Sequence, residues 1–359
     1  MILSAQAIDR RRSRRLLAAI GVVVSTLFVM QGVVPTPAMG ATGCLVKDLR
    51  AGKTYSRLQA AVDAAKPGSH LLVKGTCRGT TIVHKDLVIR GKPSSRGTPT
   101  LDGQDRKRVM KVKSGVKLTM QRLTIEDGRS RSGSGGSIVN RGKLMLYAVT
   151  VRRSRARKNG GAIYNLGNLQ VNSTSQVRGS EADLGGGIHN EGVVRLKGTS
   201  KIRGNVAKAG GGVHNLGTMR LQELSRIKNN RALPSGSGGG VHNEGTLSMK
   251  GSSSIRGNSA DLGGGVVNDA ASLSLADSSS ISGNSAQLAG GVVNDAGSVL
   301  TMSGSSAITA NYASDTGGLG NAGTLVGVKC APGSGANVFG NTPDDCQLDW
   351  ATGALLARP

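Results

Sequence analysis

The stretch Gly185-Gly186-Gly187-Ile188-His189-Asn190 is one copy of a phrase that recurs along the chain. Gly-Val-His-Asn follows at 212–215 and 240–243, and Gly-Val-Val-Asn at 265–268 and 291–294. The strong and weak copies end on eight asparagines that are 25, 25, 25, 28, 25, 26 and 27 residues apart. These are Asn140, Asn165, Asn190, Asn215, Asn243, Asn268, Asn294 and Asn321. So regular a period is typical of a solenoid, in which each repeat stacks on its neighbours.

Each repeat contains three candidate strands, of which the glycine-asparagine phrase is the first. The second carries two apolar residues at a spacing of two, such as Val194 and Leu196, and the third carries one, such as Ile202. Because side chains alternate across a strand, these residues point inward and stack about 4.8 Å apart. We therefore predict an all-β, single-stranded parallel β-helix. The eight asparagines should form a structural amide ladder at a bend, and a second ladder is expected. Its members are Asn205, Asn230, Asn258, Asn284, Asn311 and Asn341.

The segments outside the regular repeat, which spans 136–341, differ in pattern. Residues 78–135 contain strand-like segments without the tight period, and we interpret them as early turns. Within 41–77, Leu58, Val62 and Ala65 recur at helical spacing, which predicts a short amphipathic helix over 55–65. Such a helix would cap the first turn, whose open edge would otherwise be available to other strands. Residues 342–359 are expected to form the C-terminal cap.

The N-terminus has the pattern of an export signal. A basic region around Arg10 to Arg15 precedes a mainly apolar run, 16–34, and Ala38-Met39-Gly40 suits a cleavage site. We expect a bacterial signal peptide over 1–40, of the Sec or twin-arginine type, and a secreted or cell-surface protein without a membrane span after cleavage. An uncleaved anchor is the alternative, because the apolar run is long enough to cross a bilayer.

The composition of the chain indicates which classes of binding partner to expect. The formal net charge is +25, and aromatic residues make up only 2% of the chain. An exported protein this basic should associate with an anionic polysaccharide or cell-surface polymer. Specific nucleic-acid binding is not expected, because there are too few aromatic rings to stack on bases. The four cysteines allow three pairings, and their positions favour Cys44–Cys77 and Cys330–Cys346 as staples near the two ends. We expect a monomer with no cofactor.

Two groups of residues resemble known families. The helix followed by Leu71-Leu72-Val73, with Thr98 to Gly103 further on, resembles the opening of pectin-lyase-like right-handed β-helix proteins. Gly160-Gly161-Ala162-Ile163 and Ile202-Arg203-Gly204-Asn205 resemble the GGA[IVL] and FxxN repeats of polymorphic outer-membrane proteins, with Ile in place of Phe. The first resemblance implies a right-handed coil, and the second implies an adhesin-type surface protein.

A column of cations is the preferred binding site. We expect these side chains to occupy outward positions of the third strand in successive repeats, where they could follow a linear polyanion. A charged face that only prevents edge aggregation is the alternative. The residues are Arg178, Lys201, Arg203, Arg226, Lys228 and Arg256. Arg152, Arg153, Arg155, Arg157 and Lys158 should extend this charge toward the N-terminus.

Two further columns are candidates for metal or proton binding. Glu244, Asp269 and Asp295 follow the ladder asparagines and are weak candidates for Ca²⁺, with solvated turn residues as the favoured interpretation. His189, His214 and His242 precede the ladder asparagines and should form part of an outward surface stripe. Stacked imidazoles could share a transition metal, or loosen the fold near pH 6 as they gain charge. No metal is favoured.

A polysaccharide lyase or hydrolase acting on polyuronates is the catalytic alternative, and a purely structural rod is the other. Arg226-Ile227-Lys228 matches a polygalacturonase phrase in its letters, but it occupies a repeat position. The only adjacent aspartates, Asp344 and Asp345, lie beside a cysteine. Because paired carboxylates are needed for glycoside hydrolysis, we predict no catalytic residues.

Overall fold

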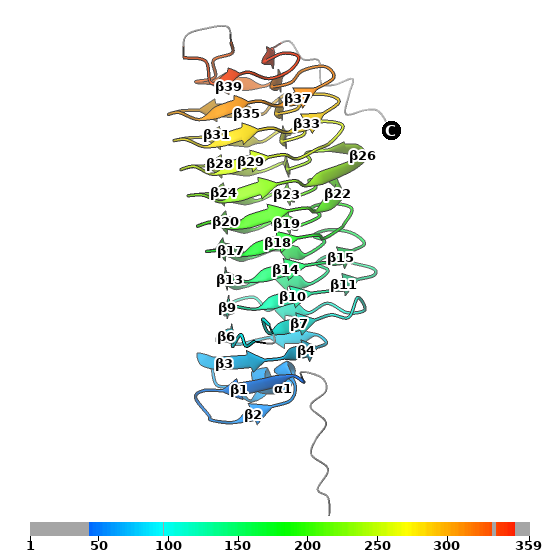
Figure 1. The fold of residues 1–359 in the computed structure, drawn as a ribbon, viewed down its shortest axis with the longest axis vertical. Coiled ribbons are helices and arrows are strands. Elements are labelled where there is room, and N and C mark those ends of the chain that lie inside the picture. Colours follow the sequence, from blue (N-terminus) through cyan, green and yellow to red (C-terminus); the bar gives the residue numbers. More distant parts are fainter. Residues whose placement is uncertain (1–42, 96, 332–334, 349–359) are drawn as a thin grey trace, which may run out of the picture. The chain divides into compact units, whose positions relative to one another are not determined.

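The computed structural model describes residues 43–95, 97–331 and 335–348, which form an all-β parallel solenoid of about 10 turns. Each regular turn contributes one strand to each of three sheets, as expected from the repeat (Figure 1). The proposed export signal, residues 1–40, lies outside the described residues, as do residues 349–359.

Sheet A contains the second strand of each repeat, preceded by the N-terminal strands. Its order is β2 (Thr54–Tyr55), β1 (Leu45–Asp48), β3 (Ser69–Lys74), β6 (Leu87–Gly91), β9 (Lys117–Gln121), β13 (Lys143–Tyr147), β17 (Asn168–Asn172), β20 (Val193–Leu196), β24 (Thr218–Leu221), β28 (Thr246–Met249), β31 (Ser272–Leu275), β35 (Val299–Met302) and β39 (Thr324–Val326). Strand β1 pairs antiparallel with β2 and β3, and the later pairs are parallel.

Sheets B and C contain the third and first strands of the repeat. Sheet B comprises β4 (Thr76–Arg78), β7 (Thr100–Asp102), β10 (Thr124–Glu126), β14 (Thr150–Arg152), β18 (Gln176–Arg178), β21 (Lys201–Arg203), β25 (Arg226–Lys228), β29 (Ser254–Arg256), β32 (Ser280–Ser282), β36 (Ala307–Thr309) and β40 (Val338–Phe339). Sheet C comprises β5 (Thr81–Val83), β8 (Met110–Val112), β12 (Ile138–Asn140), β16 (Ile163–Asn165), β19 (Ile188–Asn190), β23 (Val213–Asn215), β27 (Val241–Asn243), β30 (Val266–Asn268), β34 (Val292–Asn294), β38 (Leu319–Asn321) and β41 (Cys346–Gln347).

The core consists of aliphatic columns that run from turn to turn. In one turn, Ile188, Val194 and Ile202 come from the three sheets, and all are fully buried. Their equivalents stack in register, as in the pairing of Ile188 with Val213. Burying apolar area contributes about 25 cal/mol per Å², so these continuous columns stabilise the stack without aromatic residues.

Both asparagine ladders are present. Asn190 receives a hydrogen bond on Oδ1 from Asn165 and donates from Nδ2 to Oδ1 of Asn215, each at 2.7 Å. In the second ladder, Asn230 accepts from both the backbone N–H and the Nδ2 of Asn205 at 3.0 Å. These side chains are almost completely buried, so the ladders provide hydrogen-bond partners for polar groups at one bend from Asn140 onward and at a second bend from Asn205 onward.

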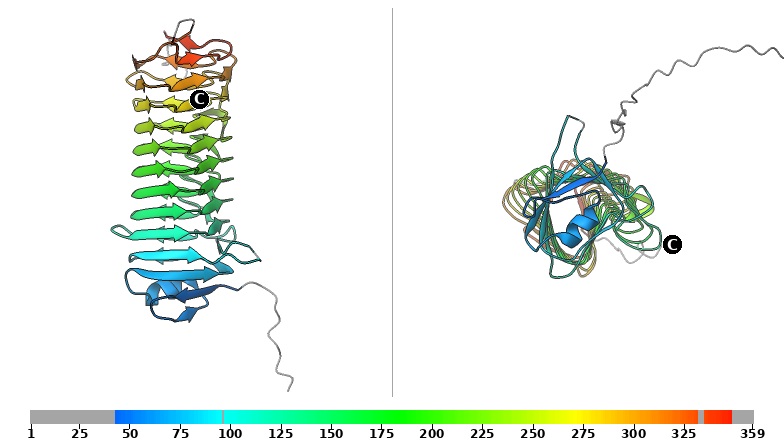
Figure 2. Two further views of the ribbon diagram at one scale, coloured as in Figure 1. Left: turned by 60° about the vertical axis from the view of Figure 1, so that its left-hand side comes forward. Right: turned by 90° about the horizontal axis from the view of Figure 1, so that it is seen from below.

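A helix and a disulfide lie at the N-terminal end. Helix α1 (Leu58–Ala64) packs against β1, β2, β3 and β5, and it lies within the outline of the sheets when viewed along the stack (Figure 2). Leu58 and Val62 form its buried face. The helix is shorter than the predicted 55–65, because Tyr55 belongs to β2. The Cys44–Cys77 disulfide is confirmed and ties β4 to the residue preceding β1.

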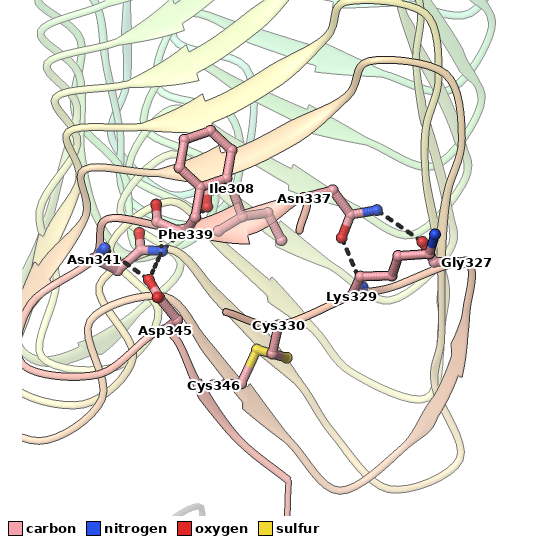
Figure 3. The surroundings of a disulfide bond; sticks show 9 residues. All are labelled: Ile308, Gly327, Lys329, Cys330, Asn337, Phe339, Asn341, Asp345 and Cys346. Carbon is pink, nitrogen blue, oxygen red and sulfur yellow. Dashed lines mark hydrogen bonds between the residues drawn. A yellow bond between two sulfur atoms is a disulfide. The ribbon is translucent and has the colours of Figure 1, made fainter. Parts of the chain in front are cut away.

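The second predicted disulfide, Cys330–Cys346, lies at the other end (Figure 3). Beside it, Oδ1 of Asp345 accepts hydrogen bonds from the N–H and Nδ2 of Asn341, at 2.8 and 2.9 Å. Asp345 therefore continues the second ladder with a carboxylate. Strand β41 also adds to sheet C, so part of the expected C-terminal cap continues the solenoid.

The repeat contains a fourth element that the sequence pattern did not reveal. Between sheets B and C the chain forms short lateral strands, visible beside the main stack in Figure 1. They are β11 (Arg129–Ser130), β15 (Arg155–Ala156), β22 (Val206–Ala209), β26 (Arg231–Ser237), β33 (Ser285–Ala286) and β37 (Tyr312–Ala313), joined by isolated bridges such as Leu184–Ala209. Gly185 makes the return to sheet C with a φ of +63°, and a Cβ there would lie 2.3 Å from the carbonyl oxygen of Ile188.

Candidate basic face and buried histidine column

Six cations lie on the outer face of sheet B, on four successive strands. Arg178, Arg203, Lys228 and Arg256 pair in register as one column, and Lys201 and Arg226 form a second beside it. The residues between the two columns, such as Ile202 and Ile227, are fully buried, so the flanking side chains point outward. The structure therefore brings all six predicted residues together at the spacing of the strands.

No ion pair neutralises the six cations in the described part of the chain, although the charge of Glu126 acts to raise the pKa of Arg178. Within the described residues, no carboxylate lies within salt-bridge distance of any of the six; Arg203 donates a hydrogen bond to Oε1 of Gln176 at 3.0 Å. Partial burial and then the charge of Arg203 lower the pKa of Arg178. Partial burial and then Arg256 lower the pKa of Lys228. The cations repel one another, and an added polyanion would relieve that repulsion.

The charge next to this face, toward the N-terminus, is instead paired. Nη2 of Arg152 lies 2.6 Å from Oε2 of Glu126. Arg153 contacts Glu126 at 2.9 Å and Asp127 at 2.8 Å, and its pKa is raised, mainly by the hydrogen bond to Asp127. These arginines extend the column in space, but their carboxylate partners offset much of the positive charge that the sequence led us to expect.

A groove of about 680 Å³ beside the lateral strands is also lined by arginines. Two of them are in ion pairs: Arg129 with Asp105 at 2.8 Å, and Arg155 with Glu181 at 3.6 Å. The groove therefore offers less unpaired charge than the outer face of sheet B.

The histidine column is buried, and the expectation of a solvent-facing stripe is wrong. His189, His214 and His242 do project from the outer face of sheet C, but their exposed fractions are only 2%, 4% and 7%. The lateral segment folds back over them. Ser237 of β26 lies 2.9 Å from Nδ1 of His242, and Leu262 packs on Val267, which continues the column.

The three imidazoles are stacked with their planes almost parallel. Ring centroids of His189 and His214 are 4.9 Å apart, and those of His214 and His242 are 5.1 Å apart. Carboxylates line the edge of the column: Glu191 lies 3.3 Å from Nε2 of His189, and Glu244 lies 2.9 Å from Nε2 of His214. The alternation of residues indicated the stack, but it could not show these carboxylate contacts.

Burial sets the protonation of this column. It lowers the pKa of His189 and His242, and together with the adjacent imidazoles it lowers that of His214 to about 3. Burial and then the charge of Asp269 raise the pKa of Glu244. Burial therefore favours the neutral form of the folded column over the charged form that we had expected it to gain near pH 6.

The carboxylates that were weak candidates for Ca²⁺ do not form a cluster of three oxygen ligands in the described residues. Asp295 is buried, and its Oδ1 accepts a hydrogen bond from the N–H of Ala296 at 2.7 Å. Glu244 and Asp269 lie near the histidines, with Oδ2 of Asp269 3.9 Å from Nε2 of His242. The acidic side chains are therefore divided between a local turn contact and the histidine column.

The match to the polygalacturonase phrase is a consequence of the repeat. Arg226 and Lys228 pair in register with Lys201 and Arg203 and occupy no special position.

Across residues 43–95, 97–331 and 335–348, no helix has the length and apolar character needed to span a bilayer. No family model, no curated protein and no solved structure matches this chain.

Proposed function

We propose that this protein is an exported, non-catalytic β-helix protein that binds anionic polymers, such as acidic polysaccharide, along the outer face of sheet B. The observation that carries the proposal is the pair of cation columns, six side chains on four strands without a carboxylate partner among the described residues. Strands in a sheet are about 4.8 Å apart, so the columns present charge at regular intervals to an extended polyanion.

The proposal includes a location and finer details of the fold. Two disulfides suit an oxidising compartment, which agrees with export by the N-terminal signal. The early turns and the position of α1 favour a right-handed coil of the pectin-lyase-like type, with the helix as its N-terminal cap. The repeats favour an adhesin-type surface protein acting as a monomer.

The test is retention of the chain on immobilised heparin and polygalacturonate. The double substitution Arg203→Glu and Arg256→Glu should weaken binding about tenfold or more, equivalent to at least about 1.4 kcal/mol of binding free energy. Retention should also fall as salt is added, because exposed charges are screened beyond about 10 Å at 0.1 M ionic strength.

The matched control is the pair Arg195→Glu and Arg220→Glu. These arginines stack in register on the outer face of sheet A, and the substitutions change the net charge by the same amount. Equal losses in both double variants would show that net charge alone governs retention and would contradict a binding face on sheet B. Release of unsaturated or shortened products from the polyuronate would instead support the lyase or hydrolase alternative.

A further inference from the structure

Three potential metal ligands converge at the edge of the histidine column. Nε2 of His214 and Nε2 of His242 lie 2.9 and 3.5 Å from the same oxygen, Oε1 of Glu244. The ligand atoms of all three residues lie within 4.8 Å of one another, and no other group of three or more His, Cys, Asp or Glu meets this criterion in the described part of the chain. The imidazoles are buried, whereas the Glu244 side chain is 37% exposed, so an ion can approach from solvent.

We propose that His214, His242 and Glu244 bind a divalent transition-metal ion of the Zn²⁺ class. Zinc bonds to histidine nitrogen and carboxylate oxygen are about 2.0–2.2 Å long, which places the ligands of a tetrahedral ion roughly 3.3–3.5 Å apart. The two observed contacts, 2.9 and 3.5 Å, are close to that separation. The ligand atoms lie within 4.8 Å of one another, so rotations that bring the two imidazole nitrogens closer and turn them toward a common point would complete the geometry.

The surrounding groups suit this assignment. Oδ2 of Asp269 lies 3.9 Å from Nε2 of His242, so Asp269 or a water molecule can take a fourth position. Oγ of Ser237 lies 2.9 Å from Nδ1 of His242. If Nδ1–H donates to that hydroxyl, the lone pair on Nε2 is left facing the carboxylate, as in the outer-shell contacts of many metal-bound histidines. Two nitrogen ligands favour Zn²⁺ or Cu²⁺ over Ca²⁺, which prefers oxygen alone.

The other end of the column lacks this convergence. Glu191 lies near His189, but its Oε1 also accepts a hydrogen bond from the Tyr164 hydroxyl at 2.5 Å. The next ladder asparagine, Asn215, is followed by Leu216 rather than by an acid. A metal bound at Glu244 would therefore join β23 and β27 specifically, two adjacent turns of the solenoid.

The experiment is titration of the EDTA-treated full chain with Zn²⁺ by isothermal calorimetry, together with thermal unfolding. We expect one Zn²⁺ per chain and a higher unfolding midpoint with Zn²⁺ than with EDTA. Co²⁺ in place of Zn²⁺ should give the visible absorption of a tetrahedral nitrogen–oxygen site. Glu244→Gln should weaken Zn²⁺ binding at least tenfold.

The control is Glu191→Gln, which removes the same charge from the equivalent position after another ladder asparagine. It should bind Zn²⁺ like the unmodified chain. Because Glu244 is partly exposed, its variant should keep the circular dichroism spectrum of the parent. Absence of saturable Zn²⁺ binding, or equal affinity in both variants, would overturn the site. Ca²⁺ that raises the midpoint as much as Zn²⁺ does would overturn the assignment to a transition metal.

Discussion

Replacing Asn230 by alanine should lower the free energy of unfolding by about 2–6 kcal/mol, because it leaves buried polar groups without partners at about 1–3 kcal/mol each. Oδ1 of Asn230 accepts from the N–H and Nδ2 of Asn205 at 3.0 Å. Its own Nδ2 donates to the carbonyl oxygen of Ile202 at 3.1 Å and to Oδ1 of Asn258 at 3.0 Å. Chemical denaturation followed by far-ultraviolet circular dichroism measures the loss.

Asn168→Ala is the matched control for this substitution. Asn168 lies in β17 of the same solenoid, but its side chain is exposed and makes no hydrogen bond within the described residues. Its replacement should change the free energy of unfolding by less than about 0.5 kcal/mol. Similar effects of the two substitutions would show that the ladder contributes little beyond the local preference of asparagine for a bend.

Acid should destabilise the fold through the histidine column, starting below about pH 6.5. Burial holds the pKa of His214 at about 3 in the folded chain, whereas an unfolded histidine titrates near 6.5. Below pH 6.5 the unfolded chain therefore binds protons that the folded column does not. Stability is complete above the unfolded pKa and falls as the pH decreases toward 3.

The expected loss from His214 alone is about 2.3 kcal/mol between pH 6.5 and 4.5, since one pKa unit corresponds to about 1.4 kcal/mol and the unfolded histidine is already half protonated at pH 6.5. His189 and His242 act in the same direction, because their pKa values are also lowered. Denaturation curves across this pH range, with EDTA present to exclude metal, measure the effect.

A triple substitution of the column by valine provides the comparison. Val267 and Val293 already occupy equivalent, buried positions in later turns, so valine fits beneath the lateral strands. The variant should retain only the pH dependence that its carboxylates contribute. If its stability falls between pH 6.5 and 4.5 as steeply as that of the parent, the histidines are not the source.

The sequence predicted much of the fold because the same residue pattern recurs in successive repeats, so each copy supports the strand assignment made in the others. The spacing of residues such as Leu169 and Val171 identified the inward positions of sheet A, and both are fully buried. The asparagines and the four cysteines were assigned to the ladders and disulfides that the structure contains. The cation columns followed from the same register.

The candidate metal site could be anticipated only in part. The repeat placed the three histidines in one column, but the contacts of Glu244 with His214 and His242 depend on how a turn residue reaches across adjacent strands. Likewise, nothing in the periodicity indicated that Arg152 and Arg153 share Glu126. Such contacts depend on side-chain conformations, which a register does not specify.

By itself, the sequence determined the stacked turns, their inward residues and the outward direction of the basic columns, because alternation along a strand fixes two faces. The tertiary structure alone decided which outer face stays exposed. Left-handed glycines such as Gly185 return the lateral segment over sheet C, while the cations of sheet B are only partly buried. Burial then favours the neutral form of the histidines, whereas the partly buried arginines stay charged, so similar outward columns acquire different chemistry.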